Sequence, residues 1–159
     1  MTGLEPMLTA AERAFVGTAR RATLSTVRPN GLPRLVPICF VLAEDADEDG
    51  RAVIYSPLDE KPKVEADPRQ LARARDIVAN GAVEVLVDRW SEDWSALGWI
   101  RLTGNAGLLE PDLERAEEHG AAVSALRAKY PQYAGQSIET RPVIRIAIAR
   151  VVRWGSVSA

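Results

Sequence analysis

Short runs along the chain alternate apolar with polar side chains, the period of two expected for half-buried β-strands. Residues 83–88, for example, carry a valine at every second position. Other stretches repeat apolar positions every three or four residues, as amphipathic helices do. We predict six strands, at residues 22–27, 32–42, 52–56, 83–88, 98–109 and 143–154, and three helices, at residues 9–21, 68–79 and 111–130.

The first two predicted strands form a hairpin. Asn30-Gly31 lies between them and tolerates the positive φ of a tight turn. Pro33 and Pro37 fall inside the second strand and remove two backbone donors from it. We therefore expect this strand to lie at an edge of the sheet, or to contain a bulge or a bend.

Helix ends are marked by capping residues. Thr9 and Glu12 have the spacing of a capping box, and Asp67 is an N-cap followed by proline. Asn80-Gly81 is expected to cap the C-terminus of the second helix. The apolar face of that helix, which should cover the sheet, consists of Leu71, Ala74, Ile77 and Val78.

The order of elements favours an antiparallel sheet, because few strand–helix–strand crossovers are available for a parallel one. Closure of this sheet into a small barrel would remove its exposed edges. A chain of 159 residues with 47% hydrophobic content fits one compact domain. We predict a mainly β domain over residues 1–159, with an N-terminal helical segment at 1–21 and a barrel at 22–154.

Charge and cysteine content narrow the function classes. The 20 basic and 22 acidic residues are spread along the chain and leave a net charge of −2. We therefore expect neither nucleic acid nor an acidic membrane as a partner. No apolar run reaches the roughly 18 residues of a membrane-spanning helix. Cys39 is the only cysteine, which suits a reducing compartment, so we expect a cytoplasmic, unprocessed protein.

The loop after the third strand carries Lys61 and Lys63 beside two prolines. A stiff backbone lowers the entropy that is lost when two long side chains converge on one anion. The following helix adds Arg69, Arg73 and Arg75. We interpret this loop as a phosphate site; the alternative is a solvated charged loop.

Three of the four tryptophans, Trp90, Trp94 and Trp99, lie within ten positions of one another. A small domain rarely hides three indoles unaided, and aromatic residues are enriched at interfaces. We therefore expect a homodimer that uses this segment. The alternative is a small intrachain core.

The sequence lacks the usual catalytic and metal-binding sets. A single histidine completes no Ser-His-Asp pattern and forms no metal cluster, so we expect no metal. That histidine, His119, is expected at the surface. Tyr55 and Arg101 are candidate proton donors, although a strand-end aromatic more often packs, and no catalytic residue is assigned.

Several motifs in a fixed order carry a family resemblance. They are Ala22-Thr23-Leu24-Ser25-Thr26-Val27, Gly31-Leu32-Pro33 with Pro37, Tyr55-Ser56 leading to Lys61-Pro62-Lys63, Ala74-Arg75-Asp76-Ile77 with Asn80, Val85-Leu86-Val87-Asp88, Asp93-Trp94, Leu97-Gly98-Trp99-Ile100-Arg101 and Lys129-Tyr130-Pro131-Gln132-Tyr133. With them the chain resembles the pyridoxamine 5′-phosphate oxidase-like superfamily, and within it the probable coenzyme F420-dependent oxidoreductases. This resemblance implies a six-stranded antiparallel split β-barrel of the FMN-binding type, flanked by short helices.

The resemblance also implies a cofactor site at a dimer interface. Lys61 and Lys63 would hold the cofactor phosphate, and Ser56 would donate a hydrogen bond to the same group. The strand face around Arg34, Leu35, Val36 and Pro37 would line the ring system. The partner subunit would contribute Trp94, Trp99 and Arg101.

The function that the resemblance implies is hydride transfer between F420 and a small organic substrate. Two alternatives are an FMN-dependent oxidoreductase and a non-catalytic module that binds a flavin, a deazaflavin or a haem-like ligand; a protein without any ligand is a further one. The chain departs from the family pattern at Glu65 and Asp67, whose charges weaken the positive potential of the loop, and at Gly81. Gly98 stands where a tryptophan is expected, which should widen the pocket. Only residues 155–159 follow the last strand, so we expect no pyridoxamine 5′-phosphate oxidase activity proper.

Overall fold

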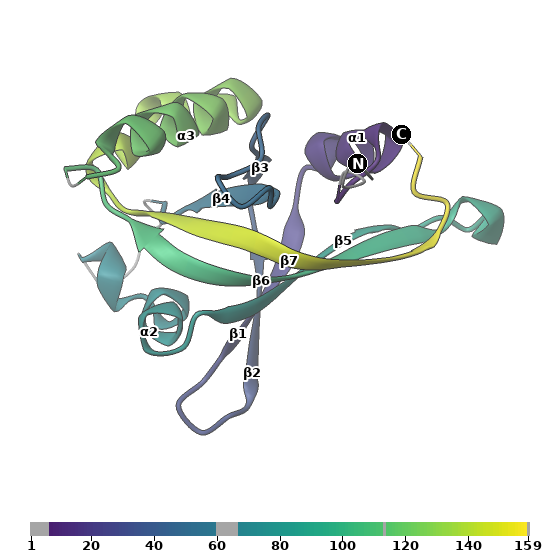
Figure 1. The fold of residues 1–159 in the computed structure, drawn as a ribbon, viewed down its shortest axis with the longest axis horizontal. Helices are drawn as coiled ribbons and strands as arrows, with labels where there is room; N and C mark the ends of the chain where they lie inside the picture. The colour runs from purple at the N-terminus through teal and green to yellow at the C-terminus, as the bar shows by residue number, and fades with distance from the viewer. Residues whose placement is uncertain (1–6, 60–66, 113, 159) are drawn as a thin grey trace.

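The computed structural model describes residues 7–59, 67–112 and 114–158. Seven antiparallel strands form one curled sheet in the order β2-β1-β5-β6-β7-β4-β3. Figure 1 shows α1 and α3 on one side of the long β6–β7 ribbon and α2 on the other. The strands are β1 (Ala22–Val27), β2 (Pro33–Ile38), β3 (Val41–Leu42), β4 (Val53–Pro57), β5 (Ala82–Arg89), β6 (Gly98–Leu109) and β7 (Val143–Gly155).

The helices are short and cover the two ends of the sheet. The α-helices are α1 (Ala10–Thr18), α2 (Ala72–Ala79) and α3 (Ala116–Lys129), and the 3-10 turns are η1 (Pro68–Gln70), η2 (Trp94–Ala96), η3 (Pro131–Gly135) and η4 (Ile138–Thr140). The predicted capping box is present, since Thr9 and Glu12 exchange both hydrogen bonds. The mainly β antiparallel fold is thus confirmed, with seven strands in place of the six predicted. Within the described residues, none of the helices has the length and apolar character needed to cross a membrane.

The additional strand arises because the predicted strand at 32–42 is bent. It divides into β2 and β3 around Phe40, whose backbone N–H donates to the Tyr130 hydroxyl at 3.1 Å. The same hydroxyl donates toward the Phe40 carbonyl at 3.0 Å. A side chain therefore satisfies the backbone at the bend, where a ladder partner is missing. The prediction that the two prolines place β2 at an edge is confirmed.

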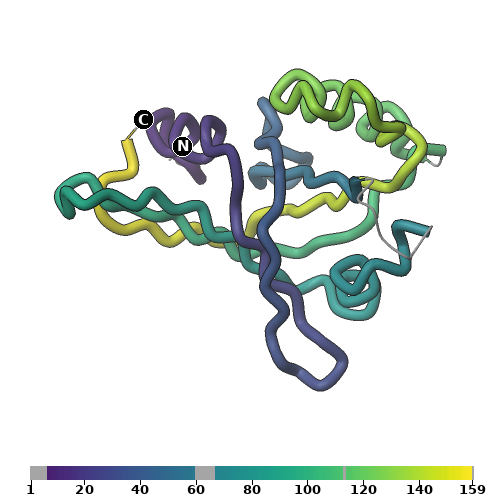
Figure 2. Tube along the Cα trace, turned by 180° about the vertical axis from the view of Figure 1, so that it is seen from behind, coloured from purple at the N-terminus to yellow at the C-terminus, as the bar shows by residue number. Residues whose placement is uncertain are grey.

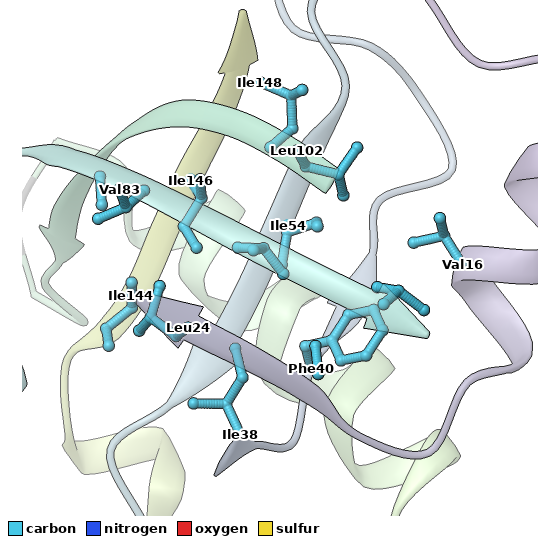
Figure 3. Close-up of a cluster of buried hydrophobic side chains, with 14 of the residues drawn as sticks. Val16, Leu24, Ile38, Phe40, Ile54, Val83, Leu102, Ile144, Ile146 and Ile148 are labelled. Atoms are coloured by element: carbon cyan, nitrogen blue, oxygen red, sulfur yellow. The ribbon is translucent and has the colours of Figure 1, made fainter. Parts of the chain in front are cut away.

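The main core fills the concave side of the curled sheet. Leu24, Ile54, Leu102 and Ile146 come from four strands and converge there without exposure to solvent (Figure 3). A second cluster, which includes Leu126, lies between α3 and the β3–β4–β7 end of the sheet. The two clusters hold opposite ends of one sheet. Figure 2 shows that this arrangement leaves the β1–β2 hairpin projecting from the body.

Four predictions about the helices are wrong. The second helix is interrupted at Leu71, so that η1 and α2 replace one continuous helix, and Val78 is 72% exposed instead of facing the sheet. Asn80 ends α2 with extended backbone, and Gly81 does not have the positive φ of a left-handed cap. His119 is buried instead of exposed, and its Nε2 lies 2.7 Å from the Arg141 carbonyl oxygen.

A buried carboxylate fastens α2 to the β1–β2 hairpin. Asp76 accepts hydrogen bonds from the Thr26 hydroxyl at 2.8 Å and from Arg34 Nε at 2.7 Å. Burial raises the pKa of Asp76, but these hydrogen bonds outweigh it and hold the pKa below its ordinary value of 3.8. The ionised form therefore stabilises the fold.

We expect Asp76→Ala to lower the free energy of unfolding by about 2–3 kcal/mol, because it leaves a buried hydroxyl and a half-buried guanidinium without their partner. Exposed Asp88 provides the control, and Asp88→Ala should change stability by no more than about 0.5 kcal/mol. Urea denaturation measures both. The Asp76 contribution should be complete above pH 3.8 and lost as the pH falls through the lower folded-state pKa. Equal effects of the two substitutions would contradict this role.

Candidate functional site

A pocket of about 210 Å³ lies where the ends of β2 and β4 meet α2 and η3. Pro37 and Cys39 come from the β2–β3 bend, and Ser56 comes from the end of β4. Strand ends and turns thus supply its walls. The lining residues are Arg21, Pro37, Ile38, Cys39, Ser56, Pro57, Asp59, Arg73 and Tyr133.

Arg73 gives this pocket its positive charge. The residue is only 8% exposed, and its Nε has no hydrogen-bond partner among the described residues. Asp59 Oδ1 lies 3.9 Å from one of its terminal nitrogens. Burial lowers the pKa of Arg73, whereas Asp59 and Tyr133 raise it less strongly. A buried guanidinium with an unused donor is suited to bind an anion.

Ser56 is also buried in this pocket. Its hydroxyl donates to the Cys39 carbonyl oxygen at 2.8 Å. The Ser56 hydroxyl proton is therefore used in a hydrogen bond to the backbone of the β2–β3 bend. A hydrogen bond from Ser56 to a ligand requires the hydroxyl to turn away from Cys39.

The predicted ring-binding face of β2 is divided by the strand geometry. Pro37 is exposed and lines the pocket, whereas Arg34 and Val36 point to the other face of the strand. Arg34 is bound to Asp76, and Val36 packs against the main core. Successive side chains alternate between faces. The structure therefore brings Pro37 and Ser56 together, but neither Arg34 nor Val36 with them.

Lys61 and Lys63 lie outside the described residues. The predicted phosphate loop is described only at its two ends, where Asp59 lines the pocket and Asp67 caps η1. Those ends connect β4 with η1, and α2 follows η1 and carries Arg73. The loop that contains both lysines thus begins at the pocket.

Trp94, Trp99 and Arg101 belong to the β5–β6 hairpin, whose tip lies at the opposite end of the molecule from α2 (Figures 1 and 2). None of the three lines the pocket. Trp99 stacks on Trp154 with ring centroids 6.5 Å apart, and the Arg101 guanidinium lies 5.5 Å from the Trp99 ring centroid. Trp94 is 74% exposed, so these side chains form no closed core within the subunit.

Gly98 does not widen this pocket. A Cβ atom at Gly98 would overlap the carbonyl group of Ser156, which follows β7 closely there. The glycine is therefore required by the close approach of two backbones. The expected widening concerns a pocket completed by a partner subunit and stays a prediction.

Sequence reasoning missed four lining residues, Arg21, Ile38, Cys39 and Tyr133. It noted Arg73 only as one of three helix arginines, although Arg73 alone of them is buried. A signal for Arg73 was its place one position before Ala74 on the apolar face of the helix. Tyr133 belongs to the Lys129–Tyr133 motif, but its approach to β2 depends on the path of η3.

A larger, more open cavity of about 780 Å³ lies between α3 and the β3–β4 connection. Eight carboxylates and three arginines line it, together with Tyr55. The Tyr55 hydroxyl donates to Glu118 at 2.8 Å, and Arg145 Nε donates to the same oxygen at 2.7 Å. Burial and Glu118 raise the pKa of Tyr55, which makes it a poor proton donor. The candidate Tyr55 thus lies outside the pocket that holds Ser56.

No group of three His, Cys, Asp or Glu side chains is placed to hold a metal ion in the part of the chain that the structure describes. In the smaller pocket the described charged side chains are the guanidinium groups of Arg21 and Arg73 and the carboxylate of Asp59. Their sum is a positive charge, which favours an anion over a cation.

A family model described as pyridoxamine 5′-phosphate oxidase matches residues 8–155. The chain belongs to this family. The match spans every strand of the sheet, and the curled antiparallel sheet with short helices is the split-barrel fold of the family. No curated protein matches the chain.

Several solved structures have the same fold as this chain, although their sequence identity to it is low. A conserved hypothetical protein from Mycobacterium tuberculosis has a TM-score of 0.66 at 18% identity, covering 98% of this chain and 89% of that chain. An FAD-binding protein from Mesorhizobium loti has a TM-score of 0.58 at 22% identity, with 92% of each chain covered. The haem storage protein HutZ from Vibrio cholerae has a TM-score of 0.59 at 11% identity, with 90% of each chain covered.

We expect Arg73→Met to separate stability from anion binding. Methionine removes the buried charge but also takes the guanidinium away from Asp59, and because these two effects oppose each other the free energy of unfolding should change by no more than about 1 kcal/mol. Affinity for inorganic phosphate should fall about tenfold or more, since a charge-assisted donor is lost. Chemical denaturation and calorimetric titration measure the two quantities.

Arg75 lies two positions away on the same helix and is exposed, so Arg75→Met is the matched control. It removes the same charge without touching the pocket and should leave phosphate affinity within about twofold of wild type. If the two variants bind phosphate equally well, Arg73 is not an anion ligand.

Proposed function

We propose that the chain is a coenzyme F420-dependent oxidoreductase whose cofactor phosphate binds in the Arg73 pocket. The observation that carries this proposal is the buried Arg73 side chain, which has an unused donor in a pocket of phosphate size. The ion pair with Asp59, at 3.9 Å, leaves the buried Arg73 Nε without a hydrogen bond, and an anionic ligand would offset the cost of burying it. Membership of the pyridoxamine 5′-phosphate oxidase family supports a phosphate-bearing redox cofactor.

The residues present fit such a group. Arg73 and Arg21 supply two guanidinium groups, and Lys61 and Lys63 belong to the segment that follows Asp59 in the sequence. Asp59 is the one carboxylate among the lining residues, so the lining has a net positive charge. The arginines and lysines would hold the phosphate. Ser56 would fix the β2–β3 bend, which forms one wall of the pocket, through its hydrogen bond to the Cys39 carbonyl oxygen.

The deazaflavin ring, when bound, supplies a hydride acceptor or donor for a small organic substrate. The chain itself would bind the phosphate, position the ring along the exposed side of Pro37 and exclude water from one face. No side chain in the pocket is arranged as an acid or a base. This absence, among the described residues, is consistent with chemistry that relies on orientation of a cofactor.

FMN is the second candidate, since an anion pocket does not by itself distinguish the two phosphates. Fold relatives described as an FAD-binding protein and a haem storage protein favour a third candidate, a binding module without turnover. The motif resemblance, from Ala22 to Trp154, favours F420 over both. Binding and turnover therefore have to be measured separately.

Fluorescence titration under equal conditions should give tighter binding of F420 than of FMN. The double variant Lys61→Ala, Lys63→Ala should weaken F420 binding by about 3 kcal/mol or more, because two charge-assisted contacts are lost. The double variant Arg28→Ala, Arg150→Ala removes the same charge from exposed positions and controls for long-range electrostatics. Unchanged affinity in the lysine variant would remove the loop from the site. If reduced F420 binds but passes no hydride to any acceptor, the protein is a binding module and not an oxidoreductase.

We also propose that the chain forms a homodimer through the β5–β6 hairpin. Trp90 and Trp94 are 69% and 74% exposed and extend from the same tip. Large exposed aromatic side chains in one place mark an interaction surface. A second copy packed there would bring Trp94, Trp99 and Arg101 toward the pocket of the partner, as the family resemblance implies.

Trp94→Ala should lower the dimer association constant by about tenfold or more, because it removes a large buried contact. Sedimentation velocity over a concentration series measures the effect. Val78→Ala, which truncates an exposed apolar side chain on α2, is the control and should leave association unchanged. A monomeric wild-type protein at all concentrations would end the dimer proposal.

A further inference from the structure

The anion pocket contains the only thiol of the chain. Cys39 lines it, is partly exposed, and belongs to the β2–β3 bend. Cys39 packs against the second core cluster, which includes the buried Tyr133 of η3. The thiol therefore lies between the β2–β3 bend and η3, at the surface that would meet a phosphate.

Positive groups surround this thiol from several elements. Arg21 and Arg73 line the same pocket, and the Lys129 amine at the end of α3 lies beside Phe40, the residue that follows Cys39. The Lys129 amine lies 4.1 Å from the Phe40 ring centroid and makes no hydrogen bond to any described residue. The thiolate is the nucleophilic form of cysteine. Among the described residues that line the pocket, the negative group is Asp59, which lies 3.9 Å from Arg73.

The unused Arg73 donor is an independent sign that this pocket receives an anion. Its Nε is buried and has no hydrogen-bond partner among the described residues. An oxygen atom bonded to the Cys39 sulfur would place an acceptor in the same small space. The thiol and the phosphate would therefore compete for one volume and one set of donors.

We propose that Cys39 is an oxidation site at which peroxide closes the phosphate pocket. The proposal rests on the proposed function, because the regulated event is cofactor binding. The thiolate sulfur attacks one oxygen of hydrogen peroxide, so that an S–O bond forms while the O–O bond breaks. The hydroxide that leaves takes a proton from solvent and becomes water. Sulfur loses two electrons, peroxide gains them, and Cys39 becomes a sulfenic acid.

The modification cannot pass to a disulfide within the chain, because no second cysteine exists. An external thiol is required to return the sulfenic acid to the thiol. The inhibited state would therefore last until a small thiol reductant reaches the pocket. Bound cofactor would protect Cys39, and oxidised Cys39 would exclude cofactor, which is a reciprocal relation.

The test compares F420 binding before and after treatment with hydrogen peroxide, with dimedone labelling and peptide mass spectrometry to locate the sulfenic acid. Oxidised wild-type protein should bind about tenfold more weakly or worse than untreated protein. In Cys39→Ser, the affinity for F420 should be nearly the same before and after peroxide treatment. Unchanged binding by protein oxidised at Cys39, absence of label at Cys39, or an equal loss in Cys39→Ser would each overturn the proposal.

A second measurement does not depend on the cofactor. Inorganic phosphate should slow the alkylation of Cys39 by iodoacetamide in wild-type protein and should lose this effect in Arg73→Met. If untreated protein binds neither F420 nor FMN, the proposed function fails, and phosphate protection alone then decides whether thiol and anion share the pocket. Alkylation at the same rate with and without saturating phosphate would show that they do not.

Discussion

The Tyr130 hydroxyl joins three distant parts of the chain, and the pocket depends on it. Tyr130 follows the last residue of α3, accepts from the Phe40 N–H and lies 3.0 Å from the carbonyl oxygens of both Phe40 and Arg20. It therefore fixes the end of α3, the β2–β3 bend and the entry to β1 together. Without this hydroxyl the buried backbone of Phe40 would lack partners, and the bend that carries Pro37 and Cys39 would have no fixed direction.

The sequence predicts the strands well because their pattern is local. β6 begins and ends at the residues expected, and the turn at Gly31 has the positive φ that Asn30-Gly31 favours. The bend at Phe40 could not be predicted in the same way, since its hydrogen-bond partner is 90 residues away. The burial of His119 likewise depends on a distant carbonyl group, that of Arg141. Long-range contacts, not propensity, decide such features.

The candidate site was predicted only in part. Ser56 and Pro37 meet in one pocket, but Arg34 and Val36 could have been separated from Pro37 by the strand period alone. Arg73 was harder to single out, because only its place on the apolar face of the helix separates the buried arginine of α2 from the exposed Arg75. The same split-barrel fold occurs in relatives described as FAD-binding and as haem storage proteins. The fold therefore fixes where a ligand can bind, and individual side chains decide which ligand.

The position of β2 at the edge of the sheet has a consequence for how copies of the chain can meet. An open strand edge invites another strand to extend the sheet, and uncontrolled extension leads to aggregates. Proline lacks the amide hydrogen that such an added strand would need, and β2 carries proline at both Pro33 and Pro37. The edge is thereby blocked against strand addition. Ordered self-association at this edge would have to use side-chain surfaces instead of backbone hydrogen bonds.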